Sequence, residues 1–129
     1  MDRARAIAVI AQAVHESIRA YQAALGQCVS PPWGEAGEMQ QWSRDAVEFA
    51  LGDPTPEAQH EEWSSAKRRD GWTFGPTQDS ARKTHPRLVP FDQLPESEKT
   101  KEAIIIGVVK ALAPVLGVTG SHQPIDFDG

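Results

Sequence analysis

The sequence predicts an α+β fold that is predominantly α-helical, with about four helices and a short β-hairpin or extended segments around Gly71-Trp72. Apolar residues recur every three or four positions in three stretches, the period of a helix with one buried face. Between residues 71 and 91 this period is lost, and glycines and prolines flank short apolar runs. The length of 129 residues, with 40% hydrophobic and 24% charged, fits one globular domain.

Helices are expected at about residues 3–25, 38–51, 55–70 and 95–113. The apolar stripe of the first is Ile7, Ile10, Val14, Ile18, Tyr21 and Leu25. That of the second is Met39, Trp42, Ala46 and Phe49, with Val47 and Ala50 beside it. The last is expected to bury Lys101, Ile104, Ile105, Val108, Val109 and Leu112. Gly26 should end the first helix, Thr55 should cap the third with Pro56 at its first position, and Pro114 and Gly117 should close the last.

Two short extended runs lie between the third and fourth helices. The first is Gly71-Trp72-Thr73-Phe74-Gly75-Pro76 and the second is Leu88-Val89-Pro90-Phe91. Both runs could form short strands that pair with each other or could remain extended segments, and the neighbouring prolines limit their length.

Charge and cysteine content exclude some classes of function. The net charge of −5 disfavours non-specific nucleic-acid binding, because no overall positive field attracts phosphate. Cys28 is the only cysteine, so an internal disulfide is excluded and a reducing compartment is favoured. The longest apolar stretch, 103–116, is too short and interrupted to span a bilayer, and the N-terminus does not resemble a signal peptide. A soluble cytoplasmic protein without membrane association is therefore expected.

The third helix has an unusual face. Instead of a Leu/Ile/Val stripe it lines up His60, Trp63 and Lys67 at spacings of three and four. An indole with a cation one turn further on suits a planar anionic ligand, because the ring stacks on a base and the ammonium meets a phosphate. In the alternative interpretation Trp63 is core, His60 bonds to a loop, and Lys67 extends its stem over apolar surface towards water.

Other residues could complete such a site. Trp33 follows two prolines and could cover a pocket, and Trp72 lies in a tight turn. Lys83, His85 and Arg87 lie in a locally basic stretch that could form one wall of an anion site, with Arg87 giving bidentate donors. The alternative is an ordinary solvated run of charge.

The sequence gives little support for catalysis. The four histidines lack metal-binding spacing, and no nucleophile elbow, phosphate-binding loop or dinucleotide fingerprint is present. We therefore expect a protein that is not an enzyme and that needs no cofactor and no metal.

One long pattern resembles the RyR domain, the repeat named after ryanodine receptors. Its first half is His60-x-x-Trp63-x-x-x-Lys67-x-x-x-Gly71-Trp72-x-Phe74-Gly75-Pro76. Its second half is Asp79, Lys83-Thr84-His85-Pro86-x-Leu88-Val89-Pro90-Phe91-x-x-Leu94-Pro95-x-x-x-Lys99. The leader, with Ala11-x-x-x-His15 and Pro32-Trp33, resembles free-standing RyR-domain proteins of bacteria and phages. The resemblance implies an RyR domain at 54–113 with a helical extension at 1–53 packed on it, and the remaining residues 114–129 are expected to form a mobile tail.

The resemblance also implies a function. The family has no established enzymatic activity, and some of its members have adenine-nucleotide pockets, where the positions of Trp63, Lys67 and Arg87 face the ligand. Phe74 and Phe91 stand where tyrosine is commoner, and Glu102 lies in a stretch that is usually more polar. A single copy of the repeat leaves two alternatives: the N-terminal helices replace a second repeat, or the protein forms a homodimer.

We therefore expect a module that binds an adenine nucleotide or a related phosphorylated small molecule, for sensing or sequestration. The alternative is a protein–protein interaction module that uses exposed tryptophans. The candidate ligand-binding residues are Trp63, Lys67, Arg87, His60, Trp72, Lys83, His85 and Trp33.

Overall fold

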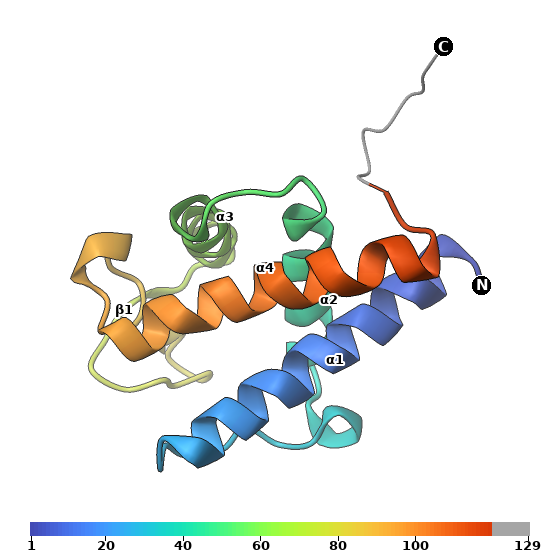
Figure 1. Cartoon of the computed structure of the whole chain (residues 1–129). Coiled ribbons are helices and arrows are strands. Elements are labelled where there is room, and N and C mark those ends of the chain that lie inside the picture. The colour runs from blue at the N-terminus through green and yellow to red at the C-terminus, as the bar shows by residue number, and fades with distance from the viewer. Residues whose placement is uncertain (120–129) are drawn as a thin grey trace. The chain divides into compact units, whose positions relative to one another are not determined.

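The computed structural model describes residues 1–119 and confirms a predominantly helical α+β fold (Figure 1). The four helices are α1 (Arg3–Ala24), α2 (Met39–Ala50), α3 (Pro56–Arg69) and α4 (Glu96–Leu116). The strands are β1 (Thr73–Phe74) and β2 (Thr84–His85), and the short 3₁₀ helices are η1 (Trp33–Glu35) and η2 (Phe91–Gln93). None of the helices within residues 1–119 has the length and hydropathy that crossing a bilayer requires.

The chain divides into two compact units. We call Met1–Pro54 together with the segment that begins at Ile104 the helical unit, and Thr55–Ala103 the aromatic unit. Helix α4 contributes to both, because the division falls between Ala103 and Ile104.

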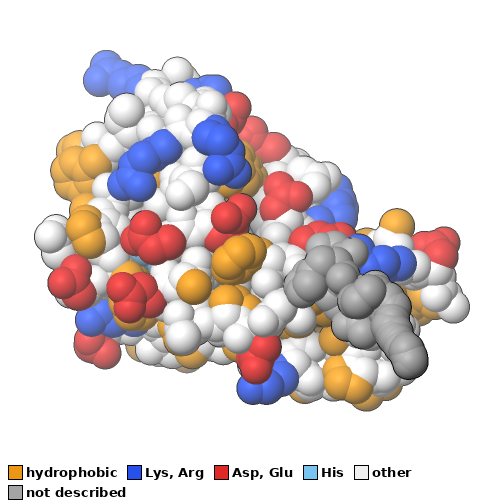
Figure 2. Space-filling model, turned by 90° about the horizontal axis from the view of Figure 1, so that it is seen from above, with side chains coloured by type: hydrophobic (Ala, Val, Ile, Leu, Met, Phe, Trp, Pro, Cys, Tyr) orange, Lys and Arg blue, Asp and Glu red, His pale blue; other side chains and the backbone are white. Residues whose placement is uncertain are grey.

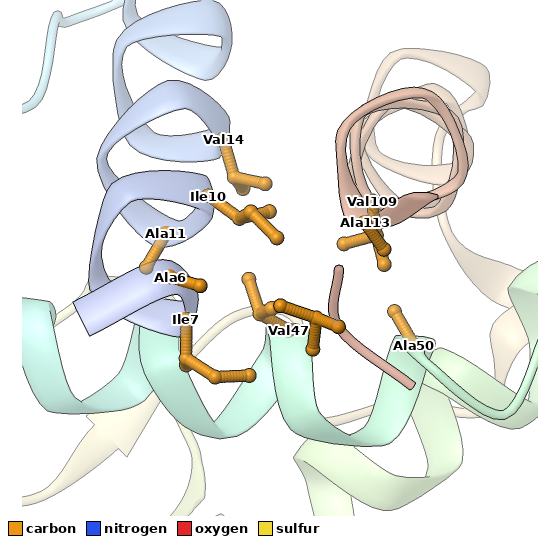
Figure 3. Close-up of a cluster of buried hydrophobic side chains, with 10 residues drawn as sticks. Ala6, Ile7, Ile10, Ala11, Val14, Val47, Ala50, Val109 and Ala113 are labelled. Carbon is orange, nitrogen blue, oxygen red and sulfur yellow. The ribbon is translucent and has the colours of Figure 1, made fainter. Parts of the chain in front are cut away.

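The helical unit has a core of small aliphatic side chains from three helices. Figure 3 shows these side chains directed towards one another: Ala6, Ile7, Ile10, Ala11 and Val14 of α1, Val47 and Ala50 of α2, and Val109 and Ala113 of α4. The predicted stripe of α1 is buried only in its first half, since Leu25 remains 48% exposed. In α2 the fully buried positions are Val47 and Ala50, which lie beside the predicted stripe rather than on it.

Helix α4 ends later than the sequence predicts. Pro114 lies inside the helix, which continues to Leu116. Gly117 then adopts a positive φ of 70°, its N–H donates to Pro114 O, and the Val118 N–H donates to Ala113 O at 2.9 Å. This pattern is a Schellman motif, which closes a helix with a left-handed glycine and folds the next apolar residue back. Val118 accordingly joins the core at 7% exposure. Of the predicted mobile tail, only residues 120–129 lie outside the described residues.

The predicted hairpin is wrong in direction and in its second strand. β1 pairs with β2 in parallel, Thr73 opposite Thr84 and Phe74 opposite His85. The chain reverses twice between them: once after β1, and again where the Asp79 and Thr84 backbones bond antiparallel. The Asp79 carboxylate stabilises the second reversal by accepting from the Ala81 and Arg82 N–H groups. Two reversals restore the original direction, so the strands run parallel.

Tight contact between the strands makes Gly75 sensitive to substitution. A β-carbon on Gly75 would lie 2.6 Å from the Thr84 Cβ, an atom that cannot move without its backbone. We predict that Gly75→Ala lowers the free energy of unfolding by about 1–3 kcal/mol, the usual cost of inserting a methyl group into filled space. Urea unfolding followed by circular dichroism measures this change.

Gly107→Ala is the matched control. This residue lies in α4, and among residues 1–119 nothing comes within 4 Å of an added β-carbon. Alanine should stabilise the helix by about 0.5–1 kcal/mol. Equal effects of the two substitutions would contradict the close contact at Gly75.

Candidate functional site

Helix α3 presents the predicted face within the aromatic unit. The Thr55 side chain caps the helix by accepting from the Ala58 N–H at 3.1 Å, with Pro56 following as predicted. His60 is 0% exposed and Lys67 only 5% exposed, while Trp63 is partly buried. Lys67 therefore does not extend into solvent as a surface lysine would.

A second tryptophan covers the ammonium of Lys67. Gly71, at φ 88°, ends α3 with the same type of motif as α4, and the Trp72 N–H donates to Lys67 O at 3.0 Å. In this motif the residue that follows the glycine packs against the residue four positions before the glycine. The spacing Lys67-x-x-x-Gly71-Trp72 thus places the Lys67 Nζ 4.0 Å from the centroid of the Trp72 ring, a favourable cation–π contact. The same Nζ lies 5.9 Å from the centroid of the Trp63 ring.

The segment after β2 supplies the other wall. The pairing of β2 with β1 fixes His85, which is buried at 4% exposure, and the Arg87 N–H donates to His85 Nδ1 at 3.1 Å. This turn brings the guanidinium carbon of Arg87 to 4.7 Å from the centroid of the Trp63 ring. The ring of His85 meets Trp63 edge-on, with 4.9 Å between centroids.

His60 joins α3 to the two segments that follow it. Its Nε2 donates to Val89 O at 2.8 Å, and its Nδ1 lies 3.3 Å from Glu102 Oε2. Its ring also stacks on Trp63, with 5.6 Å between centroids. Burial lowers the pKa of His60, but the hydrogen bonds to Glu102 and Val89 and the charge of Glu102 outweigh burial and leave the pKa raised.

Two carboxylates of α4 are part of the site, although no motif in the sequence points to a function for them. The Glu98 side chain is 15% exposed, and its Oε1 accepts from the Lys101 Nζ at 3.2 Å and lies 3.5 Å from Arg87 Nε. Glu102, one turn further on, is buried against His60. The only signal in the sequence was their spacing of four, which puts both on one face of the helix.

His85 is a neutral ring among positive charges. Burial, together with the charges of Arg87, Lys67, Lys101 and His60, lowers its pKa from 6.5 to about 3. Because Nδ1 accepts from the Arg87 N–H, the single ring proton of neutral His85 is on Nε2. The ring can therefore donate a hydrogen bond without adding charge.

The structure brings six of the eight candidate residues together. The six are His60, Trp63, Lys67, Trp72, His85 and Arg87. Lys83 instead bonds to Asp70, with 2.6 Å from Nζ to the carbonyl oxygen, and is exposed. Trp33 belongs to the helical unit, where it packs edge-on against His15 at 5.7 Å.

The arrangement suits binding of a planar anionic group, with an aromatic face and cations held by packing. Figure 2 shows acidic and basic side chains interspersed over the face it views. The whole chain has a net charge of −5, so the cations of the site are a local feature. In residues 1–119 no group of three or more His, Cys, Asp or Glu side chains could hold a metal ion.

Comparison with known families agrees with the sequence pattern. The sequence model of the RyR domain matches residues 49–116, which is more than half of the chain. The match includes every residue of the site just described and extends beyond the aromatic unit at both ends.

The lowered pKa of His85 predicts a pH-dependent stability. Below pH 6.5 the unfolded chain binds a proton at this histidine, whereas the folded chain does so only near pH 3. From pH 6.5 down to about 5, the free energy of unfolding should therefore fall by about 1.4 kcal/mol per pH unit from this residue. Urea unfolding at a series of pH values measures how the free energy of unfolding changes with pH. His85→Gln should remove the contribution of one proton to this slope.

His60→Gln separates the two histidines. The stabilisation from the raised pKa of His60 is fully present below its unfolded pKa and is lost as pH rises through its folded pKa. This variant should keep the acid slope and lose the decline in stability above pH 6.5. A His85→Gln protein with the wild-type acid slope would contradict the assignment.

Proposed function

The chain belongs to the RyR domain family, and from this premise and the geometry around Trp63 we propose that it is a non-enzymatic module that binds an adenine nucleotide or a related phosphorylated small molecule. Trp63 stacks on the planar group, and Lys67 and Arg87 hold the phosphate. His60 and His85 position the indole between them, and Trp72 positions the Lys67 ammonium.

A single observation carries the proposal. Two cations from separate parts of the aromatic unit, Lys67 and Arg87, converge on one partly exposed indole, at 5.9 and 4.7 Å from its centroid. The burial of Lys67 means that its charge is weakly screened, so an anion beside it gains more than it would at a solvated lysine. Stacking on an aromatic side chain adds about 1–3 kcal/mol per base in nucleic-acid complexes.

Binding on this face of Trp63 requires Arg87 to move. A separation of 4.7 Å between guanidinium and indole leaves room for one stacked layer, because two layers need about 7 Å at van der Waals contact. The base therefore replaces Arg87 on Trp63 or separates the two. Arg87 is suited to this movement, since its side chain is 28% exposed and its distance to Glu98 is a long 3.5 Å.

The biological setting stays part of the proposal. We place the protein in the cytoplasm of a bacterium or of a phage-infected cell, where it senses or sequesters a nucleotide, as a monomer or a homodimer. An interaction module that uses exposed tryptophans is the second candidate. Trp63 is partly exposed and could serve as such an anchor, whereas Trp72, at 4% exposure, could not.

Substitutions that preserve packing test the site. We predict that Trp63→Leu, Lys67→Met and Arg87→Met each weaken nucleotide binding by about tenfold or more, because each removes a contact worth about 1.4 kcal/mol or more. A thermal-shift screen with adenine nucleotides finds the ligand, and isothermal titration calorimetry then gives its Kd for each variant.

Arg68→Met is the matched control, because Arg68 is adjacent to Lys67 on α3 but exposed. It should leave the Kd unchanged. Wild-type affinity in the double variant Lys67→Met/Arg87→Met would show that the ligand binds elsewhere. Loss of a protein partner on Trp63→Leu, with no nucleotide bound by the wild type, would favour the interaction module.

A further inference from the structure

The charges around His85 do not balance. The positive charges of Lys67, Arg87 and Lys101 act on this ring, and His60 adds a charge when protonated. The largely buried carboxylates in the cluster are Glu98, which meets both Arg87 and Lys101, and Glu102, which meets His60. Summed over these residues, the formal charges leave an excess of one positive charge with His60 neutral and of two with His60 protonated.

We infer that the site selects a ligand group with one or two negative charges, a phosphodiester or a phosphomonoester, and discriminates against a triphosphate. This inference rests on the proposed function and specifies its ligand. A phosphodiester has a single negative charge and a phosphomonoester about two at neutral pH, so either one neutralises the excess. A triphosphate brings further charges that the cluster cannot pair, and unpaired charge is costly where burial excludes water.

Glu98 is the residue that sets this limit. Its carboxylate already pairs with Arg87 Nε at 3.5 Å and with Lys101 Nζ at 3.1 Å. Because the Glu98 side chain is only 15% exposed, water screens its negative charge poorly. Each phosphate beyond the first would be repelled by this carboxylate or would have to compete with it for the same cations. A second phosphate therefore gains less than the first.

The neutrality of His85 contributes to the same limit. If His85 were protonated, the excess would be one charge larger, and a more highly charged ligand would be matched. Burial of the ring keeps that proton off, as do the charges of Arg87, Lys67 and Lys101 and that of His60 when it is protonated. The Nε2–H remains a donor for a phosphate oxygen. The site thus offers a hydrogen bond to the anion without raising its own charge.

Calorimetric titration of the full chain with a charge series tests the inference. The series is adenosine, 3′,5′-cyclic AMP, AMP, ADP and ATP, together with inorganic phosphate and tripolyphosphate, all in EDTA at fixed ionic strength. We expect cyclic AMP and AMP to bind most tightly, with adenosine and ATP about tenfold weaker or more. We also expect phosphate to bind more tightly than tripolyphosphate.

The outcomes separate this inference from the proposed function. Tightest binding by ATP, lost in Trp63→Leu, would overturn the charge limit and leave the proposed function standing. Phosphate favoured over tripolyphosphate with no nucleotide bound would support the limit and overturn the adenine ligand. No binding across the series would overturn both.

Two variants with opposite charge effects give a second test. Glu98→Gln raises the excess positive charge by one, so the ratio of AMP affinity to ATP affinity should fall by about fivefold or more. Lys101→Met lowers the excess positive charge by one, so cyclic AMP should bind more tightly than AMP. Glu96→Gln, at an 88% exposed side chain on the same helix, should change neither ratio. Ratios are compared, so a general loss of affinity does not mimic the effect. Parallel shifts for all ligands would overturn the assignment of Glu98.

Discussion

The aromatic unit depends on holding the ammonium of Lys67 out of water. A lysine at 5% exposure loses most of its hydration, and this cost has to be offset by nearby groups of negative potential. The face of Trp72 at 4.0 Å is one of them, and it is present because Gly71 ends α3 and turns the chain back. The surrounding histidines differ because burial and the neighbouring cations disfavour a charge on His85, whereas the contacts with Glu102 and Val89 favour a charge on His60 despite its burial.

Local patterns were sufficient for most of the fold. Helix bounds followed from the three-and-four spacing, the Thr55-Pro56 start and the glycines, because these signals act within one or two turns of chain. The pairing of β1 with β2 was not predictable in this way. It depends on two successive reversals, and the second is stabilised by the carboxylate of Asp79, whose bonds to Ala81 and Arg82 only the folded chain reveals.

The candidate site shows the same division. Lys67 was selected from its spacing to Trp63 on one helix face, and Arg87 from the locally basic stretch and the family pattern. Glu98 and Glu102 were not selected, because their partners Arg87 and His60 lie in other segments of the chain. Lys83 was selected for its charge alone, but in the structure its Nζ donates to the backbone oxygen of Asp70 instead of joining the site. Contacts between distant segments decide which charges are buried, and a single sequence does not contain that information.

The discontinuity of the helical unit has a consequence for how this domain is defined. The chain leaves that unit at Pro54 and returns to it at Ile104, so the aromatic unit is an insertion, and the RyR match ends within the helical unit. Val109 and Ala113 lie inside the match, yet they are buried with Ile10 and Val14, which lie outside it. A fragment trimmed to the family boundaries would expose an apolar strip along α4. Helix α1 therefore shields that strip from water, and the compact helical unit extends beyond the residues that the sequence family matches.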